Sequence, residues 1–202
     1  MADSREGVVG ADPDTYRQEE GAELRQALGE GPLLAQGPMG TLLMSEPGGE
    51  HIPPVAWNLY EPVVVERLHA LYAASGADVL ITNSFQANER ALAHDEIYAS
   101  VREANALSVR LARKAGARFV LGSIGPNGID WLKRDSPEFR HARAAYREQI
   151  SALLVEGASG IMLETVTSLR VLEPALAAAA DVAAGMPICV SFAVNEQGDL
   201  LL

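Results

Sequence analysis

The segment Gly157-Ala-Ser-Gly-Ile-Met-Leu-Glu-Thr-Val166 contains a glycine, a short apolar run and then a carboxylate. A strand that is buried on both faces of a parallel sheet has this composition, because it needs apolar residues throughout rather than alternation. Glu164 falls where such a strand ends, and α/β proteins place their chemistry at the ends of parallel strands. The segment therefore predicts a buried parallel strand that carries a functional acid at its C-terminal end.

The same pattern recurs at Gly76 (Gly-Ala-Asp-Val-Leu-Ile-Thr) and at Gly116 (Gly-Ala-Arg-Phe-Val-Leu-Gly), and a looser copy begins at Gly185. Copies spaced by about 40 residues indicate a repeated strand and helix unit. Together with an earlier apolar segment, the copies predict strands at 32–36, 78–82, 119–123, 161–164 and 187–193. The fold class is α/β, either an open doubly wound sheet or the first five strands of a (βα)8 barrel that is incomplete at its C-terminus.

The remaining segments predict a short N-terminal tail and the helices between the strands. Residues 1–18 are polar and acidic and are expected to form a flexible tail, so that residues 19–202 make up the single barrel-like domain. Helices are predicted at 19–28, 61–76, 95–116, 136–156 and 167–180, with Ser136 and Thr167 as N-caps of the last two.

Composition excludes several classes of partner. The 202 residues carry a formal net charge of −11, which argues against binding to nucleic acid or to an anionic membrane surface. No apolar run reaches the roughly 18 to 20 residues of a membrane-spanning helix. A single cysteine, Cys189, excludes an internal disulfide and leads us to expect a cytoplasmic protein.

Four loops that follow predicted strands resemble one known family. The motifs are Gln36-Gly-Pro-Met-Gly-Thr41, Gly76-Ala-Asp-Val-Leu-Ile-Thr-Asn-Ser-Phe85, Gly122-Ser-Ile-Gly-Pro126 and Leu163-Glu-Thr-Val166. In this order and at these intervals they resemble the homocysteine S-methyltransferases, over about Leu33 to Leu202. The resemblance implies a (βα)8 barrel in which zinc, held by three cysteine thiolates, binds homocysteine as a thiolate that attacks an activated methyl group.

The resemblance also implies how the amino-acid end of homocysteine is held. Glu164 corresponds to a glutamate that contacts the α-amino group, and the backbone amides of residues 37–41 face the carboxylate. The loop of Asn83 and the Gly125-Pro126 loop line the same mouth. The substrate-binding residues expected on this basis are Gln36, Gly37, Met39, Gly40, Thr41, Asn83 and Glu164; no catalytic residue and no metal ligand is assigned.

Two positions depart from the family's pattern. Gln36 stands where the family commonly has an aspartate, so an uncharged amide replaces a partner of the ammonium group. The zinc cysteines of the family follow strands six and eight, and Cys189 lies inside a predicted apolar strand, where it is expected to be a small core residue. We therefore expect the chain alone to lack the zinc site, with the methyl donor left open.

These departures leave three functions open. The first is the N-terminal portion of a homocysteine S-methyltransferase, completed by another chain or inactive alone. The second is a non-catalytic module that binds an amino acid or a protein. The third, a different α/β enzyme in which Glu164 is an acid or base, has no second carboxylate or histidine in the matching loops to support it. An incomplete barrel presents unpaired strand edges, which predicts self-association or a second chain.

Overall fold

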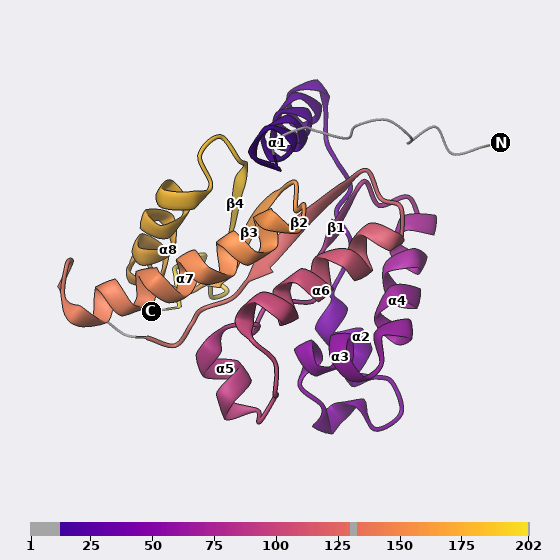
Figure 1. Cartoon of the computed structure of the whole chain (residues 1–202), viewed down its shortest axis with the longest axis horizontal. Coiled ribbons are helices and arrows are strands. Elements are labelled where there is room, and N and C mark those ends of the chain that lie inside the picture. The colour runs from indigo at the N-terminus through magenta and orange to yellow at the C-terminus, as the bar shows by residue number, and fades with distance from the viewer. Residues whose placement is uncertain (1–12, 130–132, 202) are drawn as a thin grey trace.

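The computed structural model describes residues 13–129 and 133–201, with side chains described from residue 19 onward. A sheet of four parallel strands curves through this part of the chain with helices along its outer face (Figure 1). The strands are β1 (Val79–Ile81), β2 (Phe119–Ile124), β3 (Gly160–Val166) and β4 (Ile188–Phe192), and they pair in chain order. This is the start of a TIM-type barrel that does not close, as the repeated pattern predicts.

The predicted first strand at 32–36 is shorter than expected. It contributes a single parallel bridge, Ala35 to Val79, flanked by a hydrogen bond from the Gln36 amide to the Val79 carbonyl at 2.9 Å. Residues 32–36 therefore extend the sheet beyond β1 without forming a regular strand. Their importance is positional, because they bring Gln36 to the C-terminal end of β1.

The helices are α1 (Pro13–Glu30), α2 (Met39–Met44), α3 (Trp57–Tyr60), α4 (Pro62–Ala74), α5 (Glu89–His94), α6 (Val101–Lys114), α7 (Pro137–Val155) and α8 (Leu169–Val182), with 3-10 turns at Gly49–His51 and Pro54–Ala56. Helix α1 begins at residue 13, so residues 13–18 of the expected flexible tail are helical. Residues 1–12 of that tail lie outside the described residues.

Local sequence explains where these helices begin. Ser136 caps α7, as predicted, by accepting a hydrogen bond from the Phe139 amide at 3.2 Å. The prediction that Thr167 caps α8 is wrong, because the cap is Ser168. The helix predicted at 95–116 is present but starts later than expected, at Val101. Ser100 forms a capping box with Glu103 and fixes this start, so residues 95–100 are not helical. Helix α5, at 89–94, was not predicted.

Alternating residues of the strands contribute to two separate apolar layers. Ile161 and Leu163 of β3 point outward into a cluster with α7 and α8. On the inner side, Cys189 of β4 packs with a cluster that contains Leu24 and Phe119. Leu24 belongs to α1, which lies across the end of the sheet where the strands begin (Figure 1). The interior is thus apolar and covered at that end, which leaves the opposite end for polar side chains.

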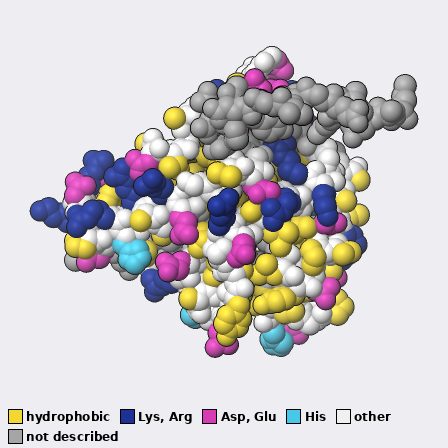
Figure 2. All heavy atoms as spheres, in the orientation of Figure 1, with side chains coloured by type: hydrophobic (Ala, Val, Ile, Leu, Met, Phe, Trp, Pro, Cys, Tyr) yellow, Lys and Arg dark blue, Asp and Glu magenta, His cyan; other side chains and the backbone are white. Residues whose placement is uncertain are grey.

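The outer helices are also joined by ion pairs across their exposed sides. Lys114 on α6 contacts Glu66 on α4 at 2.5 Å, and Arg110 on α6 contacts Glu156 after α7 at 2.8 Å. Figure 2 shows acidic and basic side chains interspersed over this face of the molecule. Such exposed pairs contribute little individually, so the stability of the layer comes mainly from its packed apolar side. Among the described residues, no helix is long and apolar enough to cross a membrane.

Candidate functional site

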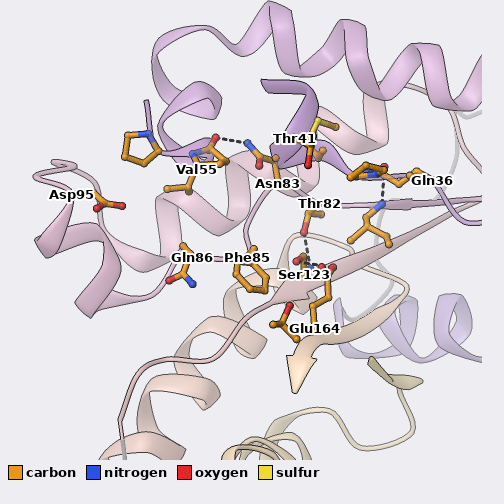
Figure 3. Close-up of a pocket in the computed structure, with 18 residues that line it drawn as sticks. Gln36, Thr41, Val55, Thr82, Asn83, Phe85, Gln86, Asp95, Ser123 and Glu164 are labelled. Atoms are coloured by element: carbon orange, nitrogen blue, oxygen red, sulfur yellow. Dashed lines mark hydrogen bonds between the residues drawn. The ribbon is translucent and has the colours of Figure 1, made fainter. Parts of the chain in front are cut away.

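A cavity of about 310 Å³ opens where β1, β2 and β3 end (Figure 3). Its wall combines side chains from these strands with the start of α2 and the loop at 53–55. The volume is at the lower end of the range for small-molecule sites. The C-terminal end of parallel strands is also where barrels of this kind hold their ligands. The cavity is therefore the candidate functional site.

Glu164 faces this cavity beside an irregularity in β3. The pairing of β3 with β4 shifts register between Leu163 and Val166, and Thr165 in the shift has a positive φ of 58°. A β-branched residue adopts this left-handed conformation only at a cost. The extra residue returns Val166 to the apolar outer cluster while Glu164 faces the interior. The strained residue thus lies beside the acid that the sequence singles out.

A hydrogen-bond network fixes one oxygen of the Glu164 carboxylate. The Ser123 hydroxyl donates to Glu164 Oε1 at 2.9 Å, and the Ser123 amide donates to Thr82 Oγ1 at 2.9 Å. Ser84 Oγ lies 2.6 Å from Thr82 Oγ1 and donates to the Ser123 carbonyl at 2.7 Å. Ser84 therefore accepts from Thr82, and each hydroxyl of the network has a donor role. Within the described residues, Glu164 Oε2 has no partner and remains available to a ligand.

The cavity also changes the acidity of Glu164. Burial raises the pKa of the Glu164 carboxyl above its ordinary value, because the ionised form loses water. The hydrogen bond from Ser123 acts in the opposite direction by stabilising the carboxylate. A buried acid with one free oxygen gains most from a positively charged ligand group, which restores the lost solvation. An ammonium group is the common biological cation of suitable size.

Gln36 lies on the cavity wall near the end of β1, with only 8% of its surface exposed. Its Oε1 accepts a hydrogen bond from the Ile81 amide at 2.9 Å and lies 3.2 Å from His69 Nδ1. His69, on α4, is fully buried, and burial lowers its pKa to about 4. The imidazole is therefore neutral at physiological pH.

Residues 37–41 begin a helix instead of forming the tight turn that their glycines predict. Pro38 is the N-cap of α2, so the amides of Met39, Gly40 and Thr41 are in its first turn and have no helical acceptor. Neither glycine has a positive φ. A side chain at Gly37 would meet the Tyr72 hydroxyl at 3.0 Å, so Gly37 makes room for Tyr72.

Asn83 lines the cavity and also makes hydrogen bonds that hold a neighbouring segment in place. Its Nδ2 donates to the Pro54 carbonyl at 2.6 Å and to Asn58 Oδ1 at 3.0 Å. Asn58 in turn donates to the Asn83 carbonyl at 2.7 Å. These bonds hold the 53–58 loop over the cavity. Because both Nδ2 hydrogens are used, Asn83 can offer a ligand only its oxygen.

The structure brings all seven residues predicted to bind substrate to the wall of this one cavity. The sequence reasoning missed other wall residues, including Thr82, Ser123, Phe85 and Asp95. Ser123 had a detectable signal, since it occupies an inward position of an alternating strand beside the predicted acid. The Gly125-Pro126 loop does not line this cavity as expected. Instead Gly125 packs against Phe85, whose ring would lie 2.6 Å from any side chain there.

The residues present do not fit the zinc site that the resemblance implies. Cys189 is half-buried in β4, contributes to the inner apolar cluster, and has its pKa raised by burial, which opposes formation of a thiolate. Among the described residues, no three His, Cys, Asp or Glu side chains come close enough together to hold a metal. One thiol in an apolar layer does not supply a three-thiolate donor set.

Fold and cavity together define a protein of the (βα) barrel class with a cavity at the C-terminal ends of its strands. The homocysteine methyltransferase MmuM from Escherichia coli, in its metallated form, has this fold, with a TM-score of 0.73 and 24% sequence identity. The similarity covers 88% of this chain and 69% of that chain. The apo form of the same protein gives a TM-score of 0.67.

Sequence comparison identifies the family. The family model for homocysteine S-methyltransferase matches residues 33–202, and the chain belongs to this family. It is 31% identical over 157 residues to methionine synthase from Mycobacterium leprae (strain TN) and 32% identical to that from Mycobacterium tuberculosis (strain ATCC 25618 / H37Rv). Each match covers 72% of this chain, which spans 13% of the length of those relatives.

Proposed function

We propose that the cavity binds homocysteine or a closely related amino acid, with the ammonium group against Glu164. The observation that carries this proposal is the Glu164 carboxylate. One of its oxygens is held by Ser123, and the other has no partner among the described residues and lies on the cavity wall. An ammonium group supplies the missing partner and the missing charge. The family and the size of the cavity support an amino acid as the ligand.

We further propose that the chain is the homocysteine-binding portion of an S-methyltransferase that transfers a methyl group to the thiol to give methionine. In this proposal the zinc thiolates come from residues outside this chain, and the methyl donor is unassigned. The free edge of β4 is consistent with pairing to a further strand, either from a second chain that completes the barrel or from another copy of this chain. Within the described residues β4 has no further neighbour, and Phe192 and Val194 are 44% and 51% exposed.

A binding titration tests the role of Glu164. Calorimetry with methionine should show saturable binding to the wild-type chain and a loss of about 10- to 100-fold in affinity for Glu164→Gln, because a hydrogen bond to a charged group contributes roughly 1.5–3 kcal/mol. Glu148→Gln, on the exposed side of α7, is the matched control and should bind like wild type. Equal affinities for Glu164→Gln and the control would contradict the proposal.

The desamino analogue 4-(methylthio)butanoate shows whether Glu164→Gln loses the contact with the ammonium group or weakens ligand binding in general. Wild type should bind it more weakly than methionine, whereas Glu164→Gln should bind the two ligands with nearly equal affinity. Such a cycle isolates the interaction between one side chain and one ligand group. A preference for methionine that survives in Glu164→Gln would place the ammonium elsewhere.

The second candidate, a non-catalytic amino-acid-binding module, rests on the lack of a fit between Cys189 and a zinc site. Both candidates use the same cavity, so binding does not separate them. Methyl transfer does: the chain is combined with a fragment that contains the remaining strands and cysteines of a family member. Formation of methionine would favour the enzyme, and binding without turnover would favour the module.

A further inference from the structure

The orientation of the Gln36 amide is determined by the groups around it. A backbone N–H can only donate, so the side-chain atom that faces the Ile81 amide at 2.9 Å is the oxygen, Oε1. The same oxygen lies 3.2 Å from His69 Nδ1. Because Oε1 only accepts, His69 carries its hydrogen on Nδ1. Two donors thus converge on one oxygen and hold the amide in a single orientation.

The other end of the amide, Nε2, has no hydrogen-bond partner among the described residues. Gln36 is a wall residue of the cavity. Figure 3 shows the Gln36 side chain at the edge of the cavity, where its oxygen accepts the hydrogen bond from the Ile81 amide. The atom presented to a ligand is therefore an NH₂ group, which is a donor and has no acceptor capacity. An ammonium group cannot form a hydrogen bond with this NH₂ group, because both groups only donate.

We propose that Gln36 is a specificity-determining residue that binds a carboxylate or carbonyl oxygen of the ligand through its Nε2. The proposal rests on the proposed amino-acid site and assigns its two polar contacts to different walls. Glu164, at the end of β3, receives the ammonium, and Gln36, beside the end of β1, receives an oxygen of the carboxyl end. The ligand class is then an α-amino acid with a free carboxylate rather than an amine.

An isosteric substitution reverses only the atom that faces the ligand. In Gln36→Glu, one carboxylate oxygen keeps the hydrogen bonds from Ile81 and His69, and the other replaces the NH₂ group in the cavity. The carboxylate of a ligand then meets a negative acceptor. Gln36→Leu is a second variant that removes the donor without adding a charge. Gln197→Glu, on the exposed 194–200 hairpin, is the control for added charge.

The experiment compares two truncated probes with methionine on the 202-residue chain. The probes are 4-(methylthio)butanoate, which lacks the ammonium, and 3-(methylthio)propylamine, which lacks the carboxylate. Titration followed by NMR or calorimetry should show that Gln36→Glu loses at least tenfold in affinity for the butanoate and gains affinity for the amine. Gln36→Leu should weaken only the butanoate, and Gln197→Glu should leave both affinities unchanged.

Butanoate affinity that is unchanged in both Gln36→Glu and Gln36→Leu would overturn the assignment, as would a weaker amine affinity in Gln36→Glu. Failure of this inference is distinct from failure of the amino-acid site. If wild type binds methionine through Glu164 and the Gln36 variants do not alter the ratio of the two probes, only the role of Gln36 is wrong. If wild type binds none of the three ligands, the amino-acid site itself is wrong and the inference falls with it.

Discussion

The buried imidazole of His69 makes folding sensitive to pH, and replacement by asparagine should remove this sensitivity. His69 is fully buried on α4, and its pKa is lowered to about 4 from an ordinary value of 6.5. Asparagine retains a donor near the position of Nδ1 and so preserves a partner for Gln36 Oε1, but it does not titrate. The substitution therefore separates the ionisation of this residue from its hydrogen bond.

The sign and the size of the pH effect on the free energy of unfolding follow from proton linkage. Between pH 6.5 and pH 4 the unfolded chain binds a proton at His69 and the folded chain does not, so the free energy of unfolding falls as the pH falls. With these two pKa values the decrease is about 2 kcal/mol between pH 7 and pH 5, and about 3 kcal/mol in full. Glu164 has the opposite sign: its raised pKa makes the folded state bind the proton more readily, which favours folding at lower pH.

Urea unfolding at a series of pH values from 7 to 4.5 measures the effect. The quantity of interest is the difference in unfolding free energy between wild type and His69→Asn. Carboxylates elsewhere contribute equally to both proteins and cancel. Between pH 7 and pH 5, the unfolding free energy of wild type is expected to fall by about 2 kcal/mol relative to that of His69→Asn. A difference that stays constant across this range would refute the reasoning, since it would mean that the imidazole titrates normally in the folded state.

Three further substitutions test the strand ends. Thr165→Asn should raise the free energy of unfolding by about 1 kcal/mol, because asparagine tolerates the positive φ better than a β-branched residue; Thr167→Asn should give no such gain in the same urea assay. Gly160→Ala should cost about 1–3 kcal/mol, because its new methyl group would lie 2.7 Å from the Pro187 carbonyl, and a cost near zero would show that β3 and β4 can separate. Phe192→Lys should reduce self-association in light scattering at high protein concentration, and an unchanged mass would mean that the β4 edge is not the contact.

Much of the fold could be predicted because parallel strands and their helices have strong local signals. The apolar runs after Gly76, Gly116 and Gly157 locate three strands almost to the residue. The errors occurred where one weak signal competed with another. The helix predicted from residue 95 starts only at Val101, because the side chain of Ser100 forms a capping box that fixes the N-terminus of α6. The segment at 32–36 reads as a strand, yet only Ala35 pairs with β1.

The candidate site was predictable in position and less so in chemistry. Inward alternation places Glu164 and Ser123 at the same end of neighbouring strands, so their contact follows from register. The orientation of Gln36 did not follow from sequence. From its residue type alone, Gln36 offers an oxygen or an amide to a ligand with equal ease. Only the fold shows that Ile81 and His69, 45 and 33 residues away, already occupy the oxygen.

The proposed recognition of an amino acid uses neighbouring elements of the described part of the barrel. Glu164, Ser123 and Gln36 belong to β3, β2 and the segment beside β1, which are adjacent elements. Their polar ends lie above an apolar layer that α1 covers from below. Because the contacts that orient these side chains come from neighbouring elements of this chain, this polar end of the cavity is preorganised. Activation of a thiol makes a different demand, since it requires donors that Cys189 does not supply. In the proposed reaction, this cavity therefore accounts for binding of the amino-acid end but not for activation of the thiol.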